Sequence, residues 1–286
     1  MQKQSIFRYF RKIAVFLIAG TVLIIISLES LKTIQSDSGL TYERYEAFLH
    51  IISDTSRFVV VPLKQLNSTY APGKVVIAIK HDVDADLERA LYMATLEYAH
   101  HIRGSYYILH TSDYYLENAD NKIVHNEAIV PVLQRIQSYG HEIGWHNDLV
   151  TLDVIYKQDA VEFLRSELTW LRSHGIHIVG TSAHGSIFSP KYGYNNYYFW
   201  NECKTRTTPD RPNNDFIIMN SDTVVMKHAA MKDFGLTYEA YFLDHNKDYN
   251  DIDHVMPDCM IHPDQMLSGQ RIIILIHPQY WHYFEE

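Results

Sequence analysis

Hydrophobic and polar residues alternate along this chain in a way that predicts repeated strand and helix units. The run Val75–Ile79 is continuously apolar, and Arg271–Ile276 contains five consecutive aliphatic residues, as expected for strands buried on both faces. Between these runs, apolar residues recur at helical spacing, for example at Ile129, Val132 and Leu133. Repeated units of this kind predict an α/β fold with a parallel sheet or a (β/α) barrel.

The expected elements follow one another along most of the chain. Helices are expected at about residues 42–52, 86–101, 126–139 and 152–174. Strands are expected at about residues 75–84, 104–110, 141–146, 176–182, 216–219, 223–226 and 271–276. The segment between the fourth and fifth strands is rich in Tyr, Asn and Pro, which indicates long loops.

The N-terminus carries a separate apolar segment. Residues 13–28 contain no charged residue, and basic residues such as Arg8, Arg11 and Lys12 precede them. A basic cluster before an apolar span keeps that end in the cytoplasm, and no small-residue cleavage site follows Leu28. The sequence therefore predicts a cytoplasmic basic tail (1–12), a transmembrane anchor (13–31), a stem with one helix (32–70) and a barrel domain (71–286).

This organisation predicts where the protein works and what it binds. A single-pass anchor with a cytoplasmic N-terminus would place the barrel domain outside the cytoplasm, in a periplasm, at a cell surface or in a secretory lumen. The membrane, through residues 13–31, is thus one expected partner. The formal net charge is −9 at pH 7, whereas nucleic-acid-binding domains carry clustered basic residues, so no nucleic-acid partner is expected.

Polar residues with metal-binding or catalytic chemistry stand at the ends of the expected strands. Asp82 and Asp84 end the first strand, and because alternate residues of a strand share a face, both carboxylates can point into one pocket. Two close carboxylates repel each other unless a cation or a shared proton relieves them. His146, His184 and His277 end three later strands. The carboxyl ends of barrel strands open onto one face, so these residues are expected to converge there.

Taken together, these segments resemble motifs of the polysaccharide deacetylase superfamily, whose members are metal-dependent (β/α) barrels that remove acetyl groups from amino sugars. The likeness is to a branch that carries His-Asp-Val-Asp, Gly-His-Glu-Ile-Gly-x-His, His-Gly and His-Pro-Gln-x-Trp. In this chain the motifs stand at His81–Asp84, Gly140–His146, His184–Gly185 and His277–Trp281. The resemblance covers about residues 75–284 and includes two weaker segments, Gly104–Tyr107 and Asp233–Leu236.

The resemblance implies a reaction and a role for each residue. It identifies Asp82 as the general base and His277 as the general acid. Asp84 and His146 would bind a divalent metal ion, with Zn²⁺ as the expected ion. The implied substrate is a carbohydrate, namely an amino-sugar polymer or glycan that loses its N-acetyl groups. A Zn²⁺ ion with an open position activates water and polarises the amide carbonyl, while the base and the acid move the protons.

The chain departs from the family pattern at two places. Deacetylases of this family place a second metal-binding histidine four residues after the first, and that position is Val150 here, which cannot bind a metal. We expect His184 to supply the third ligand, with Asp148 as the alternative. The family's Arg-x-Pro motif is also absent near the fourth strand, so the sequence names no residue that orients Asp82.

Two other functions stay open on the sequence. A degenerate barrel that binds glycans without cutting them would explain Val150, although binding alone requires neither the base Asp82 nor the acid His277. A metal-dependent glycosyltransferase also uses an Asp-x-Asp pair after an apolar strand. Such enzymes normally build a nucleotide-binding half before that pair, and residues 32–74 are too few to form one. The deacetylase is therefore the preferred hypothesis.

Overall fold

The computed structural model of the chain describes residues 39–115, 124–204, 214–243, 248–251 and 263–283. The chain divides into two compact units, residues 1–40 and 41–286, and the described helices and strands belong to the second. The predicted anchor lies outside the described residues. None of the helices in the described segments combines the length and the apolar composition that a membrane crossing requires.

A parallel sheet of eight strands forms the centre of the second unit. Its strands are β1 (Phe58–Val60), β2 (Val75–Val83), β3 (Ser105–Leu109), β4 (Glu142–Asn147), β5 (Ile178–Ala183), β8 (Tyr238–Glu239), β9 (Asp248–Asp251) and β10 (Arg271–Ile276). They follow the order β8-β5-β4-β3-β2-β10-β9, and β1 pairs with the beginning of β2. Because all of these pairings are parallel, the carboxyl ends of the strands lie at the same edge of the sheet.

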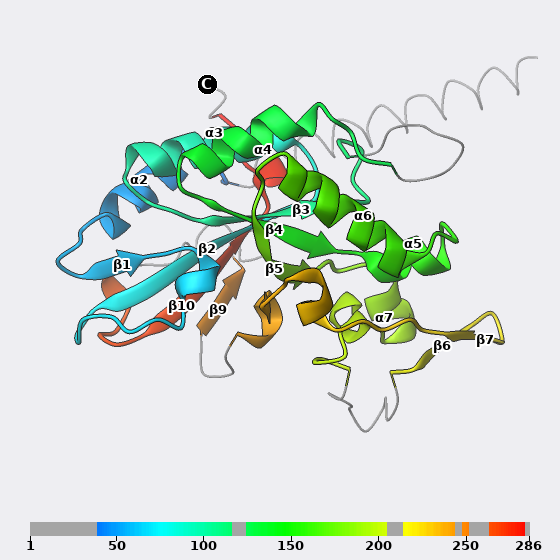
Figure 1. The fold of residues 1–286 in the computed structure, drawn as a ribbon. Coiled ribbons are helices and arrows are strands. Elements are labelled where there is room, and N and C mark those ends of the chain that lie inside the picture. Colours follow the sequence, from blue (N-terminus) through cyan, green and yellow to red (C-terminus); the bar gives the residue numbers. More distant parts are fainter. Residues whose placement is uncertain (1–38, 116–123, 205–213, 244–247, 252–262, 284–286) are drawn as a thin grey trace, which may run out of the picture. The chain divides into compact units, whose positions relative to one another are not determined.

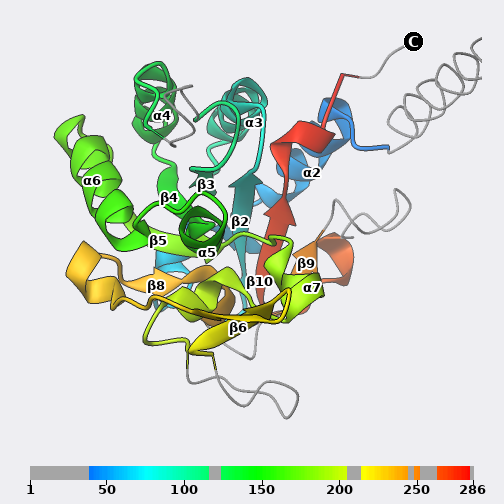
Figure 2. The same cartoon turned by 90° about the vertical axis from the view of Figure 1, so that its right-hand side faces the viewer.

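The sheet curls into a half-barrel, and Figure 2 shows its strands as an arch that runs from β8 round to β9. In the described part of the chain no strand pairing joins β8 to β9, so the arch is open between them. The predicted α/β class and parallel sheet are confirmed, and the described strands form half of the expected barrel. A separate antiparallel hairpin of β6 (Phe216–Met219) and β7 (Asp222–Val225) matches two further expected strands.

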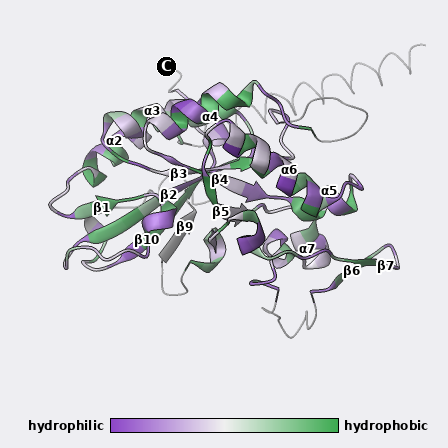
Figure 3. Cartoon of the chain, viewed as in Figure 1, coloured by the Kyte–Doolittle hydropathy of each residue, from purple (hydrophilic) through white to green (hydrophobic). Residues whose placement is uncertain are grey.

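The four longest of the described α-helices cover the outer face of the arch (Figure 1). The α-helices are α2 (Tyr42–Ile52), α3 (Leu87–Ala99), α4 (Ile129–Ser138), α5 (Leu149–Val154), α6 (Ala160–Ser173) and α7 (Phe188–Tyr192). Short 3-10 helices are η1 (Leu63–Gln65), η2 (Asn196–Phe199), η3 (Met231–Phe234), η4 (Ala240–Phe242), η6 (Pro263–Gln265) and η7 (Pro278–Tyr280). Hydrophobic and hydrophilic residues alternate along α3, α4 and α6 (Figure 3), as expected for helices with one buried side.

The prediction of one helix over residues 152–174 is wrong, because the chain forms two helices there. The helix α5 ends at Val154, and α6 begins only at Ala160. Asp159 caps α6, since its carboxylate accepts hydrogen bonds from the backbone N–H groups of Val161 and Glu162. The helix cap Asp159 therefore lies within residues 152–174, which apolar periodicity alone predicts as one helix.

The two faces of β2 carry different polar groups. Lys80 and Asp82 point into the arch, whereas His81 points outward, where its Nε2 lies 2.5 Å from a carboxylate oxygen of Glu97 on α3. The buried Glu97 also accepts hydrogen bonds from the hydroxyl groups of Tyr45 and Tyr106. Burial opposes ionisation of Glu97, but His81, His141 and the hydroxyl group of Tyr45 lower its pKa. The network joins the sheet to helices α2 and α3.

Two tyrosines fill the interior of the arch below the strand ends. The hydroxyl oxygens of Tyr107 on β3 and Tyr238 on β8 lie 2.7 Å apart, and Tyr238 donates a hydrogen bond to Glu142 at 2.8 Å. Glycines provide the room for these rings. A Cβ atom added to Gly180 would lie 2.1 Å from the ring of Tyr238, and one added to Gly144 would lie 2.4 Å from Tyr107.

This packing predicts that Gly180→Ala destabilises the protein by about 1–3 kcal/mol, because Tyr238 is held by two hydrogen bonds and cannot move aside without breaking them. Gly185→Ala is the control, since no heavy atom lies within 4 Å of its added Cβ, and its effect should stay within about 0.5 kcal/mol. Urea unfolding at pH 7 measures both. Equal stability of the two variants would show that the ring of Tyr238 is not fixed.

Candidate metal centre

The carboxyl ends of four strands bring the expected site residues together. Asp84 follows β2, His146 lies near the end of β4, His184 follows β5 and His277 follows β10. In the strand order, β10 and β2 are neighbours, as are β4 and β5, with β3 between the two pairs. The convergence expected from the sequence is thus produced by parallel pairing in register, with Leu109 opposite His146 and Ser182 opposite the same residue on the other side.

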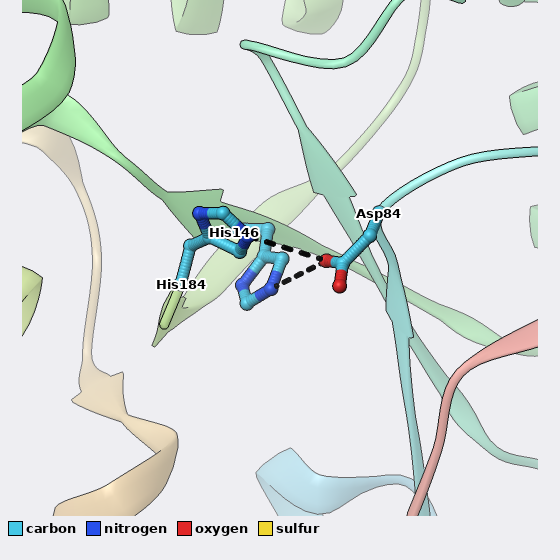
Figure 4. Close-up of side chains that lie close together, drawn as sticks. All are labelled: Asp84, His146 and His184. Atoms are coloured by element: carbon cyan, nitrogen blue, oxygen red, sulfur yellow. Dashed lines mark ion pairs between the residues drawn. The ribbon is translucent and has the colours of Figure 1, made fainter. Parts of the chain in front are cut away.

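Asp84, His146 and His184 form a cluster, here called the metal triad, that could hold a metal ion. One ligand atom from each residue lies within 4.8 Å of the others. The Nε2 atom of His146 lies 3.1 Å from Oδ1 of Asp84, and Nε2 of His184 lies 3.9 Å from the same oxygen (Figure 4). The structure therefore brings the three expected metal ligands together, including His184 as the third.

Each histidine of the metal triad is oriented through its other ring nitrogen. Nδ1 of His146 lies 2.8 Å from the backbone carbonyl oxygen of Ser182. Because a carbonyl only accepts, Nδ1 carries a hydrogen, and Nε2 is the nitrogen that faces Asp84 and would bind a metal ion. Nδ1 of His184 lies 3.4 Å from Oδ2 of Asp148. Carbonyl and carboxylate partners of this kind fix the ring and the tautomer of metal-binding histidines.

The charge of the metal triad fits a cation. Burial opposes ionisation of Asp84, but His146, His184 and His277 around it hold its pKa at about 2, so it is a carboxylate at neutral pH. A cation between these three residues would attract the Asp84 carboxylate and bind to a ring nitrogen of each imidazole. Two imidazoles and one carboxylate are a ligand set that Zn²⁺ takes at sites with an open position.

Asp148, the alternative third ligand, lies behind His184 instead of in the metal triad. Its carboxylate accepts hydrogen bonds from the hydroxyl groups of Thr111 and Thr151 and from the side-chain amide of Asn196. Asp148 is 3% exposed. Burial opposes its ionisation, but His184 and Thr151 lower its pKa. Asp148 is therefore placed to orient His184, whose own pKa is raised by Asp148 and Asp84 against the effect of burial.

Val150, which stands where the family pattern has a second histidine, is a core residue. It lies in α5, is 1% exposed and belongs to an apolar cluster with Phe188, Tyr194 and Ile217. A histidine at this position would place a polar ring in that cluster. The third residue of the metal triad is His184, which follows the neighbouring strand β5, and not the residue at position 150.

Lys80 is a site residue that the sequence analysis missed. Its Nζ lies 2.6 Å from Oδ2 of Asp82, and the two side chains are 0% and 3% exposed. The rings of Tyr107 and Tyr241 lie beside the ammonium group, at 5.7 and 4.7 Å from their centroids. Oδ2 of Asp82 also lies 3.6 Å from Nε2 of His146. Lys80 therefore orients Asp82, and its signal was a single charged residue within an apolar strand, two positions before the aspartate.

His277 lies on the other side of Asp84. Its Nε2 is 3.7 Å from Oδ2 of Asp84, the oxygen that does not face His184. Arg89 on α3 fixes the segment that carries His277, because its guanidinium donates to the backbone oxygens of Gln279 and Trp281, both at 2.8 Å. The expected base Asp82 and the expected acid His277 thus both contact residues of the metal triad.

Glu239, at the end of β8, is a second buried group that the sequence analysis did not identify. Its Oε1 accepts a hydrogen bond from the backbone N–H of Ala183, and its Oε2 has no hydrogen-bond partner. Burial raises the pKa of Glu239 to about 8, although Ala183 and the nearby Lys80 act in the opposite direction. Glu239 is therefore protonated at neutral pH and adds no negative charge beside the ion pair of Lys80 and Asp82.

Because Asp148 lies behind His184 and not in the metal triad, substitutions of these two residues should weaken metal binding to different degrees. His184→Ala should abolish binding of Zn²⁺ or Co²⁺, because it removes a ligand atom, whereas Asp148→Asn should weaken it by about 10–100-fold, because it removes only the group that orients His184. Asp159→Asn, which alters an exposed helix cap, is the control. Isothermal titration with Co²⁺ checks this order. Complete loss of binding in Asp148→Asn would make Asp148 a ligand.

The raised pKa of Glu239 predicts how stability depends on pH. The folded state keeps this proton up to a pKa of about 8, whereas the unfolded chain releases it near 4.5, so between these values the wild type loses stability as the pH rises. Glu239→Gln keeps the acceptor oxygen and removes this loss. Its stability relative to wild type should grow by up to about 1.4 kcal/mol per pH unit across that range. Urea unfolding of metal-free protein at pH 5, 6, 7 and 8 measures the difference, and parallel curves would contradict the assignment.

Comparison with models of known protein families, with curated proteins and with solved structures finds no match to this chain. The geometry and chemistry of the metal triad, Asp82 and His277 therefore carry the functional assignment.

Proposed function

We propose that the protein is a metal-dependent hydrolase that removes acetyl groups from a carbohydrate, by N-deacetylation of an amino-sugar polymer or glycan, with Zn²⁺ as the metal ion. The observation that carries the proposal is the placement of Asp82 and His277 on two sides of the metal triad, 3.6 Å from His146 and 3.7 Å from Asp84. A base and an acid beside one ion site are what amide hydrolysis requires. The fold would be a polysaccharide deacetylase barrel, of which the described strands form half.

The residues divide the reaction between them. A divalent ion held by the metal triad would polarise the acetyl carbonyl and lower the pKa of a water molecule. Asp82 accepts the proton of the attacking water through Oδ1, which has no other partner, while Lys80 holds Oδ2. His277 gives a proton to the leaving nitrogen, because an amine cannot leave as an anion. Asp148 and the carbonyl of Ser182 keep the two imidazoles in place.

The buried pair of Lys80 and Asp82 favours a hydrolase over a barrel that only binds glycans. Desolvating two charges costs several kcal/mol per ion, roughly what their attraction returns, so such a pair adds little net stability. A binding protein would gain nothing from it. The predicted membrane anchor and the predicted position of the domain outside the cytoplasm are compatible with a glycan substrate and remain predictions from the sequence.

The test is acetate release by the full-length protein loaded with Zn²⁺ or Co²⁺, with the N-acetylglucosamine tetramer as the probe. Wild type should release acetate, and Asp82→Asn should lower the rate by at least about 100-fold while it keeps the metal, because amide for carboxylate removes the base and preserves the shape. Asp54→Asn, at an exposed and remote position, is the control. Binding of the tetramer without acetate release would support the glycan-binding barrel, and acetate release only from an O-acetylated xylan would change the substrate class.

A further inference from the structure

Gly185, the residue after the metal-triad residue His184, is a glycine that the fold does not explain. Most glycines of the described chain have a positive φ, which favours glycine: Gly39, Gly73, Gly140, Gly175, Gly193, Gly235 and Gly269. Three others are crowded, because an added Cβ would meet side-chain atoms of Glu97, Tyr107 or Tyr238 within 3 Å: Gly104, Gly144 and Gly180. Gly185 has neither a positive φ nor any heavy atom within 4 Å of an added Cβ.

Flexibility does not explain this glycine either, because the backbone around it is held on both sides. The N–H of His184 donates to the carbonyl of Asn147 at 2.9 Å, and the carbonyl of His184 accepts from the side chain of Asn196 at 2.9 Å. Ser186 donates its N–H to the same carbonyl. A larger residue at position 185 would thus fit the fold, and its side chain would extend into open space.

Gly185 directly follows His184, a member of the metal triad that is itself accessible to solvent. Gly185 is exposed. The side chains of His184 and Asp84 are 23% and 24% exposed, while His146 is 1% exposed, so the triad reaches solvent at Asp84 and at His184, the residue before Gly185. On the other side of the Asp84 carboxylate, the ring of Tyr280 lies 5.8 Å from the ring of His277 and is 45% exposed. Gly185 and Tyr280 therefore neighbour the two histidines that face the two oxygens of Asp84.

We propose that Gly185 keeps open the space through which a bulky substrate reaches the metal triad, and that Tyr280 provides the facing aromatic surface. The space beside Gly185 would accept the ring that bears the acyl group, with the backbone of Gly185 against it. The naming of that ring as a sugar rests on the proposed function. The role of Gly185 in leaving space does not rest on the proposed function, because it applies to any bulky substituent on a group that binds the metal.

The test uses metal ligands of two sizes, so that it does not depend on the natural substrate. Full-length wild type, Gly185→Ala and Gly185→Leu are loaded with Co²⁺, whose visible absorption reports ligand binding, and titrated with acetohydroxamate and with the larger naphthohydroxamate. Co²⁺ content, unfolding midpoint and acetohydroxamate affinity should be unchanged in all three. Naphthohydroxamate affinity should fall slightly with alanine and by at least about tenfold with leucine, because only the larger ligand needs the space.

Three results would overturn the proposal. Equal naphthohydroxamate affinity in Gly185→Leu and wild type would show that the space is not used. Loss of acetohydroxamate or Co²⁺ binding in Gly185→Leu would give Gly185 a structural role at the metal triad. Binding of acetohydroxamate but not naphthohydroxamate by wild type would show that the approach is too narrow for a bulky substrate.

The role of Tyr280 and the identity of the substrate as a sugar are tested separately. Tyr280→Ala should raise the KM for the N-acetylglucosamine tetramer several-fold with little change in kcat, because an aromatic face binds the sugar without taking part in proton transfer. An unchanged KM would remove Tyr280 from the proposal. If wild type releases no acetate from the tetramer, the proposed function fails, whereas the hydroxamate comparison still decides the role of Gly185.

Discussion

The buried contact between Lys80 and Asp82 is the interaction on which the arrangement of the site depends. Both groups lie inside the arch, at 0% and 3% exposure. Removing one member of such a pair typically costs about 3–5 kcal/mol, because a charge is left alone in a poorly polarisable interior. Glu239 avoids a competing negative charge by keeping its proton. A neutral Glu239 does not compete with the ion pair of Lys80 and Asp82, and Lys80 holds Oδ2 of the Asp82 carboxylate.

Groups outside the metal triad hold its two imidazole rings in fixed directions, which metal binding requires. Ser182 provides a carbonyl from the neighbouring strand, and Asp148 provides a carboxylate that is itself held by Thr111 and Asn196. These supports come from β5, from the loop after β3 and from η2. The metal triad is therefore not an isolated cluster but the inner part of a network that reaches several elements.

The sequence predicted most of the strands and the convergence of Asp84, His146 and His184, because strand periodicity and parallel pairing are local rules that place strand ends at one edge. It did not predict the role of Lys80, since one charged residue in an apolar run gives no sign of its partner until the inward face is known. The position of Asp148 depends on contacts with Thr111 and Asn196, which only folding brings together. The break between α5 and α6 was missed because periodicity outweighed the cap at Asp159.

The polar side chains on the two faces of β2 also determine in which register this strand can pair with its neighbours. Lys80 and Asp82 face inward and His81 faces Glu97 outward, so a slip of one residue would turn every one of these side chains to the wrong face. The slipped strand would bury the lysine and the aspartate under the helices and leave Glu97 opposite no histidine. An all-aliphatic strand could tolerate such a shift, because either face would still be apolar. The charged residues of β2 thus favour one register of this strand and oppose pairings that would misplace the residues of the metal triad.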